Sequence, residues 1–159
     1  MLRLNSKGLL TPASAIKASI DELEETFVAN IPTNTRTKLF QQYLRYCQDL
    51  KNVLGKIDFV QWIDGSFVTS IHEPNDIDLV SFIDYNIIEK NEIHLTNLKY
   101  PASITHYGLD AYIVIVYPEN HTKFPYFLSD KLYWMDKFDK TRLNRAGNKY
   151  PKGFLEINH

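Results

Sequence analysis

The chain has 159 residues, of which 44% are hydrophobic and 23% are charged, and its formal net charge is −1. This composition is typical of a globular protein with one core, so we expect one domain over residues 1–159. It argues against a dedicated nucleic-acid binder, whose isoelectric point usually exceeds about 9. No apolar run approaches the roughly 20 residues that span a bilayer, and the first residues lack the apolar core of a signal peptide.

Two helices are predicted in the first third of the chain, after about a dozen irregular residues. Ser19 and Glu22 form a capping-box pattern that predicts a helix over residues 19–27. Apolar residues then recur at helical spacing over residues 35–54, and Gly55 follows as a C-cap. The single cysteine, Cys47, falls on this apolar stripe, so we expect it to pack in the core of a cytoplasmic protein that contacts no membrane.

Strands dominate the remainder of the chain. Apolar runs predict strands over residues 59–63, 77–83, 109–117 and 153–157. A short helix is expected in the connection at residues 86–98, and a longer helix over residues 127–144. The expected fold class is α/β (α+β): a small mixed β-sheet with N-terminal helices packed on it and a C-terminal helix.

Charge is unevenly distributed along the chain. Residues 56–119 contain ten acids and three lysines, whereas residues 121–152 contain eight basic residues and three acids. This asymmetry fits a metal-binding centre flanked by phosphate-binding groups, and it fits equally a solvated basic helix face.

Asp76 and Asp78 are the first candidate site residues. In a strand, residues i and i+2 point to the same face, so the two carboxylates project together while Ile77 and Leu79 point into the core. Carboxylates at this spacing suit Mg²⁺, or Mn²⁺ in its place, because hard cations prefer oxygen ligands. Alternatively, both acids face solvent on a half-exposed strand.

Two further features strengthen the metal interpretation. Gly65 and Ser66 directly follow a predicted strand, where a glycine lets the backbone approach an anion closely. Asp110 opens a strongly apolar strand, and an unpaired buried acid there would be costly. Each has a simpler explanation as well: a plain turn glycine, or a strand-end acid that faces solvent.

Together these residues resemble the signature of the polymerase-β-like nucleotidyltransferase superfamily. The matching elements are Gly65-Ser66, a gap of nine residues, Asp76-Ile77-Asp78, and the later strand-borne Asp110. Asp64 departs from the pattern, since a small or apolar residue is common at that place. The whole chain, from GLLTPAS near its start to the final Lys152-Gly153 segment, also looks like short bacterial proteins of the minimal nucleotidyltransferase type, often encoded beside a toxic partner.

The resemblance implies a specific reaction. Asp76, Asp78 and Asp110 would bind Mg²⁺, and Gly65 and Ser66 would hold the triphosphate of an NTP such as ATP. A nucleoside monophosphate would pass to a hydroxyl of a protein or RNA acceptor, with pyrophosphate released. A partner toxin is one candidate acceptor, in a toxin–antitoxin or phage-defence context.

Other residues are secondary candidates. Phosphate or acceptor contacts are assigned to four basic side chains: Lys123, Lys131, Arg142 and Arg145. Tyr133 and Trp134 would serve as a base-stacking platform. Alternatively, and favoured by their helical spacing, Leu132, Trp134, Met135 and Phe138 pack in the core. His72, His106 and Asp64 are expected in turns near the site, with Asp64 tuning its electrostatics. The rival hypothesis is a catalytically weak binding module of the same fold, acting through its many aromatic residues.

Overall fold

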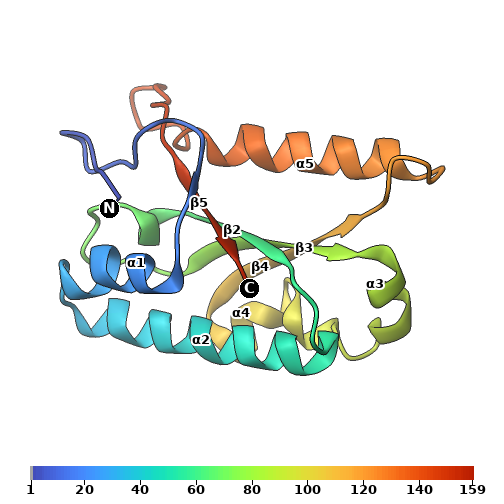
Figure 1. The fold of residues 1–159 in the computed structure, drawn as a ribbon. Helices are drawn as coiled ribbons and strands as arrows, with labels where there is room; N and C mark the ends of the chain where they lie inside the picture. Colours follow the sequence, from blue (N-terminus) through green and yellow to red (C-terminus); the bar gives the residue numbers. More distant parts are fainter. Residues whose placement is uncertain (1) are drawn as a thin grey trace.

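The computed structural model, which describes residues 2–159, contains one five-stranded mixed sheet in the order β1-β5-β2-β3-β4 (Figure 1). Strand β2 is antiparallel to both β3 and β5, whereas β3 with β4 and β1 with β5 are parallel pairs. The predicted mixed α+β class is confirmed. The strands are β1 (Ala15–Lys17), β2 (Val60–Asp64), β3 (Ile77–Asp84), β4 (Leu109–Val116) and β5 (Phe154–Asn158).

Helices cover both faces of this sheet. Ser19 caps the first helix through the predicted capping box with Glu22. Thr33 caps the longest helix, which Gly55 ends. Within residues 2–159, no helix has the length and apolar character needed to cross a membrane. The helices are α1 (Ile20–Glu24), which runs on as a π-helical turn (Glu25–Ala29), α2 (Asn34–Leu54), α3 (Tyr85–Asn91), α4 (Ala102–Tyr107) and α5 (Phe124–Phe138).

Alternation along the strands divides the interior into two cores. Odd-numbered residues such as Leu79 and Ala111 pack against α1 and α2, together with the buried Cys47. Even-numbered residues such as Trp62 and Val80 pack against α5, which lies alone on its face of the sheet (Figure 1). In β2 to β5 the parity of a residue therefore tells which helix layer its side chain meets, whereas β1 has the opposite parity, with Ile16 packed in the core of Leu79 and Ala111.

Three elements differ from the sequence prediction. Helix α5 begins three residues earlier and ends six residues earlier than the predicted residues 127–144. Pro125 lies in its first turn, where proline is favourable because the missing N–H has no helical partner. The helix ends because the chain turns back: the Asp139 carbonyl accepts a hydrogen bond from the Lys152 amide, and Thr141 N–H donates to the Tyr150 carbonyl.

The other two differences are added elements. Strand β1 was not predicted, and its three residues gain their partner only through β5, at the far end of the chain. The connection between β3 and β4 contains α3, the 3-10 turn Thr96–Leu98 and α4, where one short helix was expected.

Candidate functional site

Three aspartates stand side by side where the central strands meet one end of the sheet. Asp64 is paired with Asp78 across β2 and β3, and Asp78 with Asp110 across β3 and β4. Directly paired residues share a face of the sheet. All three aspartates are even-numbered, so their side chains point to the α5 side, in a row that we call the acid row.

The acid row lies beyond the part of the sheet that α5 covers. The next row on the same face consists of Trp62, Val80 and Tyr112, which pack in the core beneath α5. Asp76 precedes β3 by one residue and stands two positions before Asp78, so it extends the row toward solvent. The predicted common orientation of Asp76 and Asp78 agrees with this placement.

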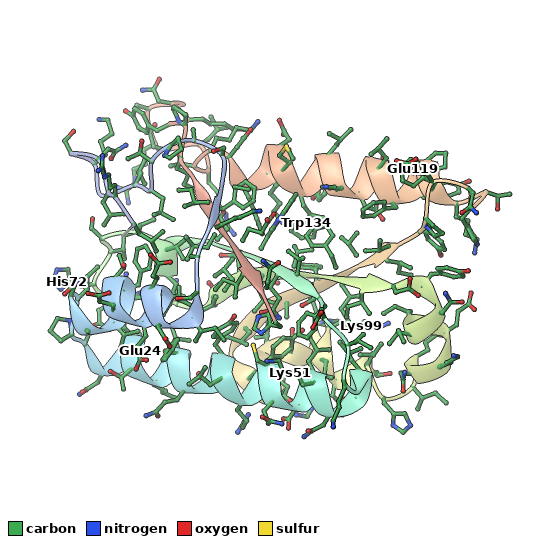
Figure 2. The ribbon with its side chains drawn as sticks, in the orientation of Figure 1. Glu24, Lys51, His72, Lys99, Glu119 and Trp134 are labelled. Atoms are coloured by element: carbon green, nitrogen blue, oxygen red, sulfur yellow. The ribbon has the colours of Figure 1, made fainter. Side chains whose placement is uncertain are left out.

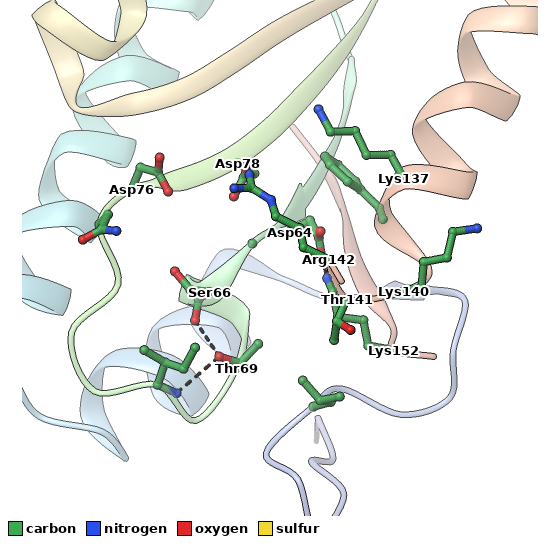
Figure 3. Close-up of a pocket in the computed structure, with 15 residues that line it drawn as sticks. Asp64, Ser66, Thr69, Asp76, Asp78, Lys137, Lys140, Thr141, Arg142 and Lys152 are labelled. Carbon is green, nitrogen blue, oxygen red and sulfur yellow. Dashed lines mark hydrogen bonds and ion pairs between the residues drawn. The ribbon is translucent and has the colours of Figure 1, made fainter. Parts of the chain in front are cut away.

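A pocket of about 470 Å³ lies over this end of the sheet (Figure 3). Its floor includes Asp64, Gly65, Ser66, Asp76 and Asp78. The opposite wall comes from the end of α5 and the segment after it, which contribute Lys137, Lys140, Thr141, Arg142 and Lys152. Acids therefore face cations across the opening, as expected for a site that binds a metal ion together with an anionic group.

Burial, with repulsion between neighbouring acids added to it, raises the pKa values of carboxyl groups at this site. Burial raises the pKa of Asp78 to about 6, and the charges of Asp76, Asp64 and Asp110 add to the effect, while Arg142 opposes it. The pKa of Asp76 is also raised, by burial first and then by Asp110. A cation placed among these groups would relieve the repulsion.

Asp64 is a buried strand residue and not the expected turn acid. It ends β2, and its carboxylate forms an ion pair with Lys152, with both side chains less than a tenth exposed. Burial raises the pKa of Asp64 to about 6, while Lys152 opposes the rise. Sequence reasoning assigned no role to Lys152. The available signal was alternation along the chain. Lys152 lies two residues before Phe154, whose side chain packs in the α5 core, so the lysine is expected on the same buried face.

Gly65 has a positive φ of 82° and lies against the acid row. A Cβ built on this residue would stand 1.9 Å from Asp78 Oδ2, so the glycine leaves room for the carboxylate. Ser66 begins one 3-10 turn, Ser66–Val68. Ser66 lines the pocket, and its carbonyl accepts a 2.7 Å hydrogen bond from Thr69 Oγ1.

Arg36 fixes the loop that follows Gly65, and sequence reasoning assigned it no role. It is fully buried on α2 and donates to the carbonyls of Phe27 and Phe67, each at 2.8 Å. It also donates to the Thr69 carbonyl at 2.8 Å and to the Ile71 carbonyl through Nε at 3.0 Å. Its position on the apolar stripe of α2 was the available signal, since a charged residue there must find buried partners.

The predicted basic residues fall in different places. Arg142 lines the pocket, with Nη2 3.7 Å from Asp78 Oδ1, although its side chain is 88% exposed. Lys123, Lys131 and Arg145 are not among the residues that line the pocket. Lys123 precedes α5 at the end of the helix remote from the site and lies over the Tyr117 ring.

The histidines and aromatics are placed as follows. His72 and His106 do not line the pocket. The main-chain carbonyl of each accepts a hydrogen bond from a side chain, that of Thr33 for His72 and that of Arg45 for His106. Trp134 points from α5 into the core, while Tyr133 beside it is 61% exposed (Figure 2). The core interpretation is confirmed for Trp134 and Phe138 and is wrong for Leu132 and Met135, which are exposed.

The donors fit a hard cation by their chemistry. Within residues 2–159, no three His, Cys, Asp or Glu side chains already stand together as a ligand set. Asp110 Oδ1 is nevertheless buried, with no hydrogen-bond partner among the described residues. An orphaned carboxylate oxygen beside Asp78 is the donor that Mg²⁺ prefers. Binding would require Asp76, Asp78 and Asp110 to turn toward a common point.

Comparisons with known proteins give one match. No curated protein and no solved structure matches the chain. A sequence family described as a family of unknown function, DUF6932, matches residues 2–158, which is nearly the whole chain. The chain therefore belongs to the DUF6932 family.

Proposed function

We propose that the protein is a Mg²⁺-dependent nucleotidyltransferase. The observation that carries the proposal is the register of β2, β3 and β4, which sets Asp78 directly between Asp64 and Asp110 on the open part of one sheet face. The resemblance in sequence connects Gly65-Ser66 and Asp76-Ile77-Asp78, and the strand register that pairs Asp110 with Asp78 supports the third acid, although Asp110 does not line the pocket. This arrangement is expected when carboxylates share metal ions.

Each side chain has a role in this proposal. Asp76, Asp78 and Asp110 would hold Mg²⁺. The ion would neutralise the negative charge of the triphosphate and of the attacking oxygen. Ser66 contacts the phosphates, and Arg142 on the opposite wall neutralises their outer charge.

The reaction is an in-line displacement at the α-phosphorus. The acceptor oxygen forms a bond to phosphorus, the bond to the bridging oxygen of pyrophosphate breaks, and pyrophosphate leaves. Asp110 accepts the hydroxyl proton or orients the hydroxyl. The acceptor is a hydroxyl on a protein, such as a partner toxin, or on RNA.

A transfer assay tests this function. The protein is incubated with each α-labelled NTP, Mg²⁺ and extract from its host, and labelled acceptors are separated by electrophoresis. Wild type should label an acceptor, Asp78→Asn should not, and Asp130→Asn should behave as wild type because Asp130 is exposed on α5, away from the pocket. Equal labelling by wild type and Asp78→Asn would exclude transfer at this site.

A second candidate is a binding module of the same fold. The observation that favours it is the exposed apolar surface of α5, where four side chains are between 44% and 69% exposed: Tyr126, Leu128, Leu132 and Tyr133. Thermal unfolding with NTP separates the two candidates. A ligand at one hundred times its Kd stabilises the fold by about 2.7 kcal/mol, so the enzyme should show a Mg²⁺-dependent rise in Tm and the binding module none.

A further inference from the structure

A series of aromatic rings adjoins the acid row at its β4 edge. The Tyr100 and Tyr112 rings are stacked, with centroids 5.4 Å apart and planes at 21°. The Tyr112 ring in turn contacts the Trp134 ring, with centroids 4.6 Å apart. Tyr112 lies two residues after Asp110 on the same face of β4, which is about 7 Å along a strand. The series therefore begins in the α5 core and ends at Tyr100.

Tyr100 is the exposed end of this series, and its backbone is fixed. The residue is 51% exposed. Its amide donates a 2.7 Å hydrogen bond to the Ala111 carbonyl, which ties it to β4, the edge strand. The fixed backbone and the stacking on Tyr112 restrict the ring before any ligand arrives, which reduces the entropy lost on binding.

A cation accompanies the rings. Lys137 Nζ lies 4.5 Å from the centroid of the Trp134 ring and 5.5 Å from that of the Tyr112 ring. The same lysine lines the pocket over the acid row. Aromatic rings beside a positive charge are the combination that binds single-stranded nucleotides, because bases stack on the rings while cations neutralise phosphate.

We propose that Tyr100, supported by Tyr112 and Lys137, is a stacking subsite for a nucleobase. The inference rests on the proposed function, because that function places a nucleotide at the neighbouring acid row. An apolar peptide fits less well, since Lys137 and the acids border the rings and would be desolvated without partners. The base belongs either to the NTP or to the 3′ end of an RNA acceptor, and stacking chemistry is common to both.

Fluorescence of 2-aminopurine, which is quenched when the base stacks, tests the subsite. Two probes are titrated with Mg²⁺ present: 2-aminopurine riboside triphosphate, and a short oligoribonucleotide with 2-aminopurine at its 3′ end and no triphosphate. Tyr100→Ala should weaken binding of one probe by roughly 5- to 150-fold and abolish its quenching. Tyr100→Phe should retain both, because the ring remains.

The matched control is Tyr126→Ala, since Tyr126 is likewise an exposed tyrosine, at 69% exposure, but lies on α5 outside the ring series of Tyr100, Tyr112 and Trp134. Loss with the triphosphate probe assigns the base to the incoming nucleotide, and loss with the oligoribonucleotide assigns it to the acceptor. Unchanged binding and quenching in Tyr100→Ala, or no quenching of either probe by wild type, would overturn the subsite.

The two proposals fail in different ways. The subsite is measured by binding and the proposed function by transfer, so an Asp78→Asn variant that still quenches the probe supports the subsite independently of catalysis. Conversely, transfer that persists in Tyr100→Ala with unchanged quenching removes the subsite and leaves the proposed function intact.

Discussion

Asp78 illustrates how a buried carboxylate destabilises the protein that carries it. Its carboxylate is buried beside three other acids, and only the exposed Arg142 compensates it. Folding therefore favours the protonated form of Asp78, whereas a site for a cation needs the ionised form. Such opposition between stability and function is common where charge is concentrated to bind a ligand.

Replacing Asp78 by Asn should stabilise the ligand-free protein at pH 7. The pKa of Asp78 is raised from 3.8 to about 6 in the folded state, chiefly by burial. A raised acid pKa contributes stability that is present below pH 4 and is lost as the pH rises through about 6. At pH 7 the gain should be about 1–3 kcal/mol.

Urea unfolding at pH 7.5 and at pH 4 measures this effect. The gain from Asp78→Asn should be large at the higher pH and small at the lower one. Asp130→Asn, at an exposed position on α5, should change neither value appreciably. A loss of stability at pH 7.5 would show that Asp78 is stabilised in its ionised form.

Gly65→Ala should destabilise the fold through two separable effects. A positive φ costs a non-glycine residue about 1 kcal/mol or more, and the new Cβ would meet Asp78 Oδ2 at 1.9 Å. Gly55→Ala is the matched control, because Gly55 has a similar φ of 79° and nothing within 4 Å of its Cβ position. Denaturant unfolding of the two variants should show a larger loss at Gly65, and equal losses would mean that Asp78 moves aside freely.

At the scale of elements, α2 organises the loop beneath the pocket through one side chain. Arg36 is fully buried and donates hydrogen bonds to the carbonyls of four residues, Phe27, Phe67, Thr69 and Ile71. Three of these carbonyls belong to the segment after Gly65. The helix and the loop are thus joined by side-chain hydrogen bonds to the backbone.

Arg36→Ala should cost about 3–5 kcal/mol, since it strands several buried carbonyls at once. Arg36→Lys should recover only part of the loss, because an ammonium lacks the planar fork of donors. Arg45→Ala on the exposed side of the same helix should cost less than about 1 kcal/mol. Denaturant unfolding gives these values, and hydrogen exchange should accelerate over residues 66–71 in the Arg36 variants. An unchanged exchange rate there would exclude Arg36 as the residue that holds the loop.

Elements whose pattern is local were predictable from sequence. Helix α2 and strands β2 to β5 were expected within a few residues of their observed bounds, because their apolar periods are clear. The end of α5 was wrong by six residues, since the pairing of residues 139–141 with residues 150–152 that ends it depends on tertiary structure. Strand β1 depends in the same way on β5.

The residues of the candidate site also differ in whether local sequence could predict them. Asp76, Asp78 and the Gly65-Ser66 turn carry a recognisable spacing, and Asp110 carries the signal of an acid in an apolar strand. Arg36 and Lys152 carry a weaker signal, a charged residue among apolar neighbours, which does not identify their partners. Lys152 pairs with Asp64, 88 residues away, and three of the four carbonyls that Arg36 binds lie more than 30 residues away in sequence. Spacing therefore predicted the acids, and only the fold revealed what the two buried cations bind.

At the scale of the whole molecule, titrating groups at opposite ends of the sheet respond to pH in opposite directions. Asp64 and Asp78 have raised pKa values, so their ionisation weakens the folded state as the pH rises. His159 is stacked on Phe59, and burial lowers its pKa to about 4. The neutral His159 stabilises the fold above pH 6.5, and this contribution is lost as the pH falls toward 4.

His159→Gln should therefore alter the pH profile of stability. As the pH falls from 7 to 5, protonation of the aspartates stabilises the folded state. Over the same range, His159 protonates in the unfolded state and not in the folded state, which lowers the free energy of unfolding. The variant lacks only the second effect, so its free energy of unfolding should rise more steeply on acidification than that of wild type. Parallel profiles from urea unfolding at several pH values would show that His159 protonates equally in both states.

Because α5 ends early, the strands that align the acids and the rim of the pocket belong to different parts of the chain. The sheet register that aligns the acids involves residues 60–64, 77–84 and 109–116, whereas the rim of the pocket is the connecting segment after Phe138. Insertions or deletions between Thr141 and Tyr150 would reshape that rim without shifting any strand pair. Members of one family can thus keep the same chemical floor and admit partners of different size, and loop exchange offers a direct way to redirect the site.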